Sequence, residues 1–197
     1  MSEEALSLNK PMPPPILRPP PKSAWLVFSG GVDNQSVGRI LNAMCLATQT
    51  GGYTDVHFMF QSAGGIIGDG ICLYNFFKAY TLPLTVYNAG AVQSAAAIAF
   101  LGAASRKTSR YGSFMIHRTV SPAISVTSDR LSAMAGSLMA DDARMEAILH
   151  EHITLTTEQW AVHRASDLYL TADEAVTAGI ATLGDFTPPA REQVYNL

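Results

Sequence analysis

From Ala24 onward, short apolar segments typical of β-strands alternate with segments of helical periodicity, and this alternation restricts the fold more than any other feature. Strands are predicted at residues 24–30, 54–60, 84–90 and 113–117. Helices are predicted at residues 33–50, with Asp33 as the cap, at 68–80, in a small-residue segment opened by Ser94, and at 128–152. A strand followed by a helix, repeated three times, indicates an α/β domain with crossover connections.

The predicted helix at 128–152 carries an apolar stripe at helical spacing. Its members are Leu131, Met134, Leu138, Met139, Met145, Ile148 and Leu149. Such a stripe is typical of a helix that packs on a core or on another subunit. A short helix at 156–166 and a helix–strand unit at 171–186 are expected to complete the domain.

Composition narrows the class of protein. Charged residues make up 15% of the 197 residues, against a usual fraction of roughly 25%, and mean hydropathy is +0.14. We therefore expect a homo-oligomer that buries more surface than one small domain can. The net charge of −3 and the lack of a basic run give no support for nucleic-acid binding. The polar N-terminus and the broken apolar run at 90–104 indicate a soluble, cytoplasmic protein without a membrane span.

Proline sets off the N-terminal segment. Seven of the eleven prolines fall between Pro11 and Pro21, a density that favours polyproline II and forbids helix. Residues 1–23 are thus predicted to be an arm, either a semi-rigid spacer or a docking peptide for a partner or neighbouring subunit. Residues 24–186 form the predicted domain, and 187–197 a C-terminal tail. Cys45 and Cys72 make no disulfide framework or metal cluster and are expected to be small buried hydrophobes.

A first candidate site follows the second strand, at Ser62-Ala63-Gly64-Gly65. Paired glycines allow close backbone approach and can direct amides toward an anion or oxyanion, although they equally suit a plain tight turn. The segment is neither a GxGxxG nor a GxxxxGK[ST] loop, so nucleotide binding is unsupported, and no cofactor or metal is expected.

A second candidate is Ser94, which opens a helix among alanines. Helix capping is the commonest role of a serine there. Alternatively, Ser94 is a nucleophile at a helix N-terminus, where free amides and the helix dipole favour a developing oxyanion.

A nucleophilic serine needs a base, and His117 is the best candidate among the five histidines because it ends an apolar strand at the sheet edge. His163 lies among polar residues and is expected at the surface. Asp129 and Asp173 lie near helix starts, which indicates caps. Asp167 is therefore the best candidate for the carboxylate that orients His117.

Four segments in register resemble the ClpP family of self-compartmentalised serine proteases, over about residues 24–186. FQSAGG resembles the NSPGG of that family, GAVQSA its GxxxSM, FMIHR its MIHQP, and DLYLTADEAVTAGI its DRFLSAxEAxEYGL. The resemblance implies that Ser94 is the nucleophile, His117 the general base and Asp167 the orienting acid. It further implies that the amides of Gly65 and Ala95 form the oxyanion hole.

The resemblance also implies an α/β spiral of ββα units, shared with crotonases, with a protruding handle helix at 128–152. Family members form heptameric rings that stack in pairs around a chamber, cleave peptides or unfolded proteins, and are fed by an AAA+ unfoldase. Here the proline arm replaces the axial loop and first helix of the family, Ala63 replaces a proline, and residues 119–124 replace a glycine-rich strand. These departures leave the unfoldase, the ring size and the specificity open.

Three other functions remain as alternatives. A crotonase-type acyl-CoA enzyme would share the fold and a two-amide oxyanion hole, but no CoA-binding signature is present. A Ser–Lys peptidase would use Lys107, which His117 makes unnecessary. A catalytically silent ring subunit would have no need of all three triad residues.

Overall fold

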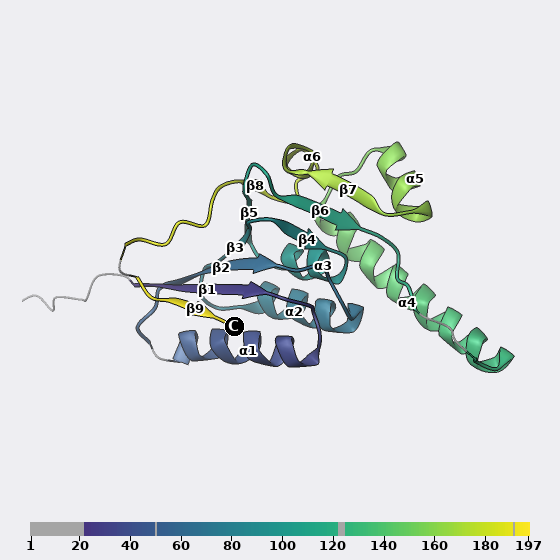
Figure 1. Ribbon diagram of the computed structural model, residues 1–197, viewed down its shortest axis with the longest axis horizontal. Helices are drawn as coiled ribbons and strands as arrows, with labels where there is room; N and C mark the ends of the chain where they lie inside the picture. Colours follow the sequence, from purple (N-terminus) through teal and green to yellow (C-terminus); the bar gives the residue numbers. More distant parts are fainter. Residues whose placement is uncertain (1–21, 50, 122–124, 191) are drawn as a thin grey trace, which may run out of the picture.

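A six-stranded sheet, parallel throughout, forms the centre of the computed structural model, which describes residues 22–49, 51–121, 125–190 and 192–197 (Figure 1). Its strand order is β8-β5-β3-β2-β1-β9. The strands are β1 (Ser23–Ser29), β2 (Asp55–Gln61), β3 (Leu84–Asn88), β5 (Ser105–Thr108), β8 (Thr182–Leu183) and β9 (Val194–Asn196). The first three strands follow the predicted alternation, whereas β5, β8 and β9 are short strands without an apolar run of their own.

A second, three-stranded sheet continues the chain beyond the large one. It comprises β4 (Ala91–Gln93), β6 (Ser113–Ile116) and β7 (Leu168–Thr171) in the order β4-β6-β7. β4 pairs parallel with β6, and β6 pairs antiparallel with β7. A bridge between Ser62 and Val92 joins β4 to the end of β2, so the small sheet begins where the large one ends.

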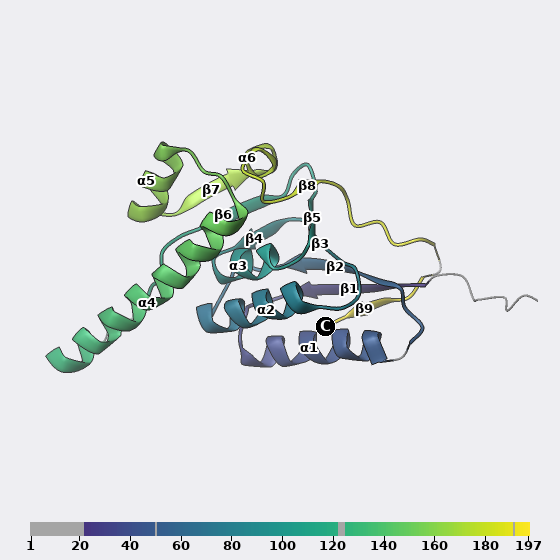
Figure 2. The same cartoon turned by 180° about the vertical axis from the view of Figure 1, so that it is seen from behind.

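Six helices accompany the sheets in the described part of the chain. They are α1 (Asn34–Gln49), α2 (Ile67–Ala79), α3 (Ala95–Leu101), α4 (Ser128–His152), α5 (Thr157–Ala165) and α6 (Ala172–Thr177). Figure 2 shows α2 and α3 lying over one face of the large sheet, while α4 projects well beyond the rest of the molecule. None of the described helices is long and apolar enough to cross a membrane.

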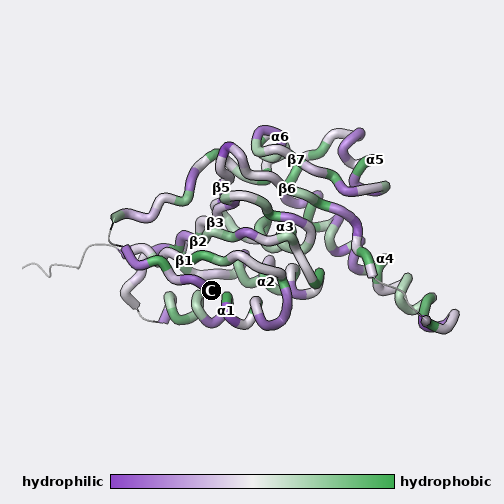
Figure 3. The backbone as a smooth tube through the Cα atoms, viewed as in Figure 1, coloured by the Kyte–Doolittle hydropathy of each residue, from purple (hydrophilic) through white to green (hydrophobic). Residues whose placement is uncertain are grey.

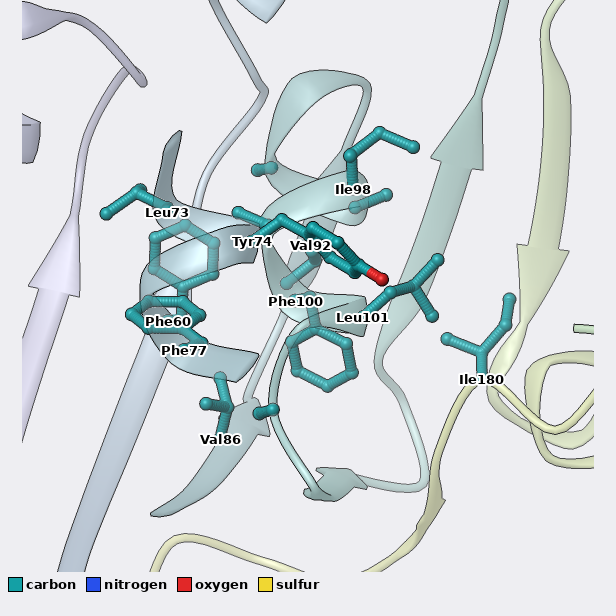
Figure 4. Packing of buried hydrophobic residues seen from close by; sticks show 14 of the residues in the cluster. Phe60, Leu73, Tyr74, Phe77, Val86, Val92, Ile98, Phe100, Leu101 and Ile180 are labelled. Atoms are coloured by element: carbon teal, nitrogen blue, oxygen red, sulfur yellow. The ribbon is translucent and has the colours of Figure 1, made fainter. Parts of the chain in front are cut away.

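The core lies between the large sheet and its helices. Alternate residues of β1 and β2, such as Phe28, Phe58 and Phe60, face the helices and are fully buried. α3 is buried along its entire length and contacts α2 closely. A Cβ at Gly102 would lie 2.3 Å from the Tyr74 carbonyl oxygen, so only glycine allows this approach. Figure 4 shows Phe77 and Leu73 packed beside Phe60.

The opposite face of the large sheet carries an aromatic cluster. Trp25 stacks on His57 with ring centroids 4.1 Å apart, and Phe186 meets the edges of both Trp25 and Tyr87. His57 is also held by Asp55, at 2.8 Å, and by the Tyr87 hydroxyl, at 2.7 Å. The connection from β8 to β9 therefore covers part of the face opposite α2 and α3.

α4 serves two environments. Met145, Ile148 and Leu149 at its C-terminal end are buried in the core. Leu131 and Met139 are 51% and 68% exposed, and Figure 3 shows hydrophobic stretches along the projecting part of the helix. The predicted apolar stripe is thus core at one end and an open apolar surface at the other.

Several predictions about single residues were wrong. Cys45 and Cys72 are exposed, because each lies on the outer side of its helix. The caps of α4 and α6 are the hydroxyls of Thr127 and Thr171, and Asp129 and Asp173 lie in the first turns instead. Asp33 does cap α1, since its carboxylate accepts from the Ser36 amide at 2.8 Å.

His163 was expected at the surface but is completely buried. Its ring meets the Trp160 ring edge-on, and neither ring nitrogen has a hydrogen-bond partner among the described residues. Burial lowers the pKa of His163, and the nearby backbone of Ile116 offsets this only in part. The folded protein therefore favours the neutral form of His163.

Stability is expected to fall as pH decreases below about 6.5, the ordinary pKa of histidine. The unfolded chain binds a proton there while folded His163 stays neutral, so this stability is complete above pH 6.5 and is lost toward the lower folded pKa. For one proton the slope is at most about 1.4 kcal/mol per pH unit. Urea denaturation between pH 7.5 and 5.5 measures it, and His163→Leu should flatten it. An unchanged slope in the variant would assign the effect to another group, such as His152.

Candidate active site

Ser94 lies at the turn between β4 and α3 and has an unusual backbone. Its φ is 52° and its ψ is −129°, a conformation that costs a non-glycine residue about 1–3 kcal/mol and recurs at functional sites. Three hydrogen bonds hold the backbone: the Ser94 amide donates to the Met115 carbonyl at 2.7 Å, and the Ser94 carbonyl accepts from the amides of Ala97 at 2.9 Å and Ile98 at 3.4 Å. The side chain makes no capping hydrogen bond, so the capping interpretation is wrong.

The Ser94 hydroxyl instead meets His117. Nε2 of His117 lies 2.8 Å from Oγ of Ser94, within hydrogen-bond distance. β6 positions the imidazole, since His117 directly follows Ile116 and β6 pairs with β4, which ends one residue before Ser94. A neutral imidazole at this distance can remove the hydroxyl proton while the Ser94 oxygen attacks a substrate.

The glycine turn after β2 lies against this pair. Its shape is set by the Ser62 hydroxyl, which accepts from the Gly64 amide at 3.0 Å, and by two backbone bonds to Val32. Gly64 has φ of 97° and Gly65 of 156°, and a Cβ on Gly65 would lie 2.1 Å from the Val32 carbonyl oxygen. Both positions therefore require glycine.

Two backbone amides at the site are available as donors. No hydrogen bond among the described residues uses the Gly65 amide. Ala95 is the first residue of α3, and the first amides of a helix have no partner within it. Both adjoin Ser94: Ala95 follows it in the chain, and Gly65 lines the same cleft.

This cleft has a volume of about 420 Å³. One wall is the N-terminal end of α2 with the glycine turn, and another is α4. Its apolar lining comprises Ile66, Ile67, Val120, Met134, Leu138 and Met145. The rest of the lining is polar and includes Thr119, Ser137 and Asp141 besides the serine–histidine pair. No group of three His, Cys, Asp or Glu residues that could hold a metal occurs in the described ranges.

Asp167, the third expected member, is not joined to the pair. Its side chain is exposed, and no hydrogen bond links it to His117 within the described part of the chain. The antiparallel register nevertheless pairs Ile116 with Leu168. Continuing that register by one residue, forward from β6 and backward from β7, puts Asp167 opposite His117. The structure thus gathers Ser94, His117, Gly65 and Ala95, and leaves Asp167 close in register but unbonded.

Asp142 was missed by the sequence analysis. It lies on α4, is buried, and accepts from the Thr119 amide at 2.7 Å, the Thr119 hydroxyl at 2.8 Å and Arg118 at 2.6 and 2.7 Å. Burial raises the pKa of Asp142, but the bonds from Thr119 and Arg118 outweigh it and hold the pKa below its usual value. The sequence does contain a signal that could have identified Asp142 as buried. It lies on the apolar stripe of the helix, four residues after Leu138 and three before Met145.

The consequence is a firm link between α4 and the segment that follows His117. Thr119 also donates to the Leu138 carbonyl at 3.1 Å. Because Thr119 and Leu138 both line the cleft, this network fixes the distance between two of its walls.

The sequence matches the Clp protease family over residues 21–182. The chain belongs to the Clp protease family. This confirms the predicted resemblance, and the parallel sheet with its six described helices is consistent with the ClpP-like α/β fold. Clp proteases are normally oligomeric and act on peptides, so membership supports a peptidase.

Replacing Asp142 by Asn should lower the free energy of unfolding by about 1–3 kcal/mol, because the partly buried Thr119 and the half-exposed Arg118 lose a charged acceptor that is itself buried. Urea denaturation at pH 7 measures the change. Asp141→Asn is the matched control, since the neighbouring carboxylate pairs with the half-exposed Arg144 and should contribute less than about 1 kcal/mol. Equal losses in the two variants would contradict a specific role for Asp142.

Proposed function

We propose that this Clp protease family member is a serine endopeptidase in which Ser94 is the nucleophile and His117 the general base. The observation that carries the proposal is the 2.8 Å contact between Ser94 Oγ and His117 Nε2 at a residue with strained backbone. Strain of this kind persists only where surrounding structure maintains it. A merely structural serine would need neither the strain nor the imidazole.

The proposed reaction follows from the positions of these groups. Ser94 Oγ attacks the carbonyl carbon of the peptide bond while His117 Nε2 takes the hydroxyl proton. The carbonyl oxygen becomes an oxyanion, which accepts hydrogen bonds from the Gly65 amide in the glycine turn and from the Ala95 amide at the start of α3. His117 then gives its proton to the leaving amine, and the same steps with water release the acyl group from Ser94.

Asp167 has the role of holding His117 in the correct tautomer and stabilising the imidazolium. The β6–β7 register supports this assignment, because it brings the two residues opposite each other at the ends of paired strands. The exposure of Asp167 favours a second candidate, a subunit that is silent until assembly or a partner aligns the carboxylate. The two candidates differ in whether Ser94 reacts in the protein alone.

The proposed setting is a ring chamber of several copies. Exposed Leu131 and Met139 on the projecting part of α4 provide an apolar surface for a facing subunit. The same helix lines the cleft through Met134 and Leu138, so contact between subunits would bear directly on the substrate site. The substrate class is a peptide or unfolded protein whose apolar side chain contacts the apolar lining of the cleft.

A fluorophosphonate probe tests the nucleophile. The purified protein should be labelled on Ser94, as mapped by mass spectrometry, because only an activated serine reacts with the probe. Labelling should disappear in Ser94→Ala and persist in Ser137→Ala, a matched change of another serine that lines the cleft. Absence of labelling in the assembled wild-type protein would favour the silent subunit, and labelling elsewhere would overturn the assignment.

Asp167→Asn tests the orienting acid. The variant should lose about 10²–10⁴-fold in kcat on a fluorogenic peptide with an apolar residue before the cleaved bond, and in the rate of probe labelling. Stability should be unchanged because the side chain is exposed. Asp173→Asn changes another exposed carboxylate, six residues further along, and should retain full activity. Full activity in Asp167→Asn would remove it from the site.

A further inference from the structure

An apolar groove lies at the edge of the large sheet, separate from the cleft described above. It has a volume of about 270 Å³ and lies between α1, β1 and the C-terminal strand β9. Its lining includes Leu26, Ala43, Leu46, Tyr53, Tyr195 and Leu197. None of the residues that line it also lines the Ser94 cleft. Leu46 is half-exposed there and adds to the apolar lining.

Two tyrosines define the chemistry of the groove. The hydroxyls of Tyr53 and Tyr195 lie 3.2 Å apart, so the two side chains meet at one end. Tyrosine offers an apolar ring together with a hydroxyl that can hydrogen-bond a peptide carbonyl. Grooves lined by such rings are the usual recognition surface for proline-rich segments in the polyproline II conformation. The Tyr195 hydroxyl donates to Oε1 of Gln193 at 3.1 Å and accepts from the Tyr53 hydroxyl. Both hydroxyl protons are therefore used within the chain, and the rings are the part of the groove that packs against prolines.

A proline-rich segment of this chain begins beside the groove. The last proline of this segment is Pro21, and Lys22, the first described residue, follows it directly. The Lys22 carbonyl accepts from the Thr54 amide at 2.9 Å, and its ammonium lies 5.3 Å from the centre of the Tyr53 ring. The arm is therefore tethered next to a residue that lines the groove.

The tether makes the arm of the same chain the favoured occupant. Eleven residues in polyproline II extend over about 34 Å, at about 3.1 Å per residue, which is ample to reach and cross the groove. A segment tethered by so short a connection has an effective concentration of about 1 mM or more, well above that of a free partner.

We propose that the groove bounded by α1, β1 and β9 is the docking site for residues 11–21 of the same chain, bound in an extended polyproline II conformation. Docking covers Leu46 and Tyr195. It also packs the arm on β9, the edge strand, which in the described residues pairs with β1 alone. The arm thereby holds the C-terminal strand in place, and the two ends of the chain stabilise each other. The proposal is independent of the peptidase assignment.

A photo-cross-linking experiment in the full chain tests it. Ile16, in the middle of the arm, is replaced by p-benzoylphenylalanine, the protein is irradiated, and the cross-link is mapped by mass spectrometry. The expected product joins residue 16 to the segment 43–53 or 194–197 within one chain. A product between two chains, a product at another surface, or no product from substitutions at residues 16, 17 and 18 would each overturn the proposal.

Two further variants keep the result specific to the groove. Leu46→Lys places a charge on the α1 side without changing β9, and should lower the yield of the cross-link at least tenfold. Tyr195→Ala removes one ring and should do the same. Tyr111→Ala is the matched control, because Tyr111 is 90% exposed and does not line the groove, and its yield should stay unchanged. Equal yields in all variants would also overturn the proposal.

Discussion

The backbone pairing of β4 is the constraint on which the rest of the site depends. On one side, Ser62 and Val92 bridge β4 to the end of β2, and on the other β6 pairs with it and accepts the Ser94 amide. These bonds hold Ser94 in its strained conformation and bring the glycine turn, the serine and His117 to adjoining strand ends. The strain at one residue is thus offset by hydrogen bonds of both sheets.

α4 links the site to the outer part of the molecule. Its C-terminal half anchors in the core through Met145 and Leu149, while Asp142 holds Thr119 two residues after His117. Its N-terminal half forms a cleft wall and continues into an exposed apolar surface. The Clp protease family is normally oligomeric, and α4 connects this exposed apolar surface to the wall of the cleft.

β9 is an edge strand of the large sheet, with β1 as its one partner among the described strands. β9 is short and is held by a few backbone bonds, among them the one from the Leu197 amide to the Val27 carbonyl at 3.0 Å. Short edge strands need cover or shielding against unwanted pairing. An arm rich in proline is well suited to such cover, since its residues lack the amides that would extend a sheet.

The sequence by itself determined the elements with strong local patterns: the first three strands of the large sheet, the bounds of α4, and the glycine, serine and histidine positions of the site. Each depends on periodicity or on a residue whose backbone needs are local. Only the tertiary structure decided that β4, β7 and β9 form strands, and that His163 and Asp142 are buried while Cys45 and Cys72 are exposed. It also decided that Asp167 and His117 each lie one residue beyond the paired ends of β7 and β6, with no hydrogen bond between them among the described residues. Periodicity reports which face of an element is apolar, but the partner that a polar side chain meets is set by segments distant in the chain.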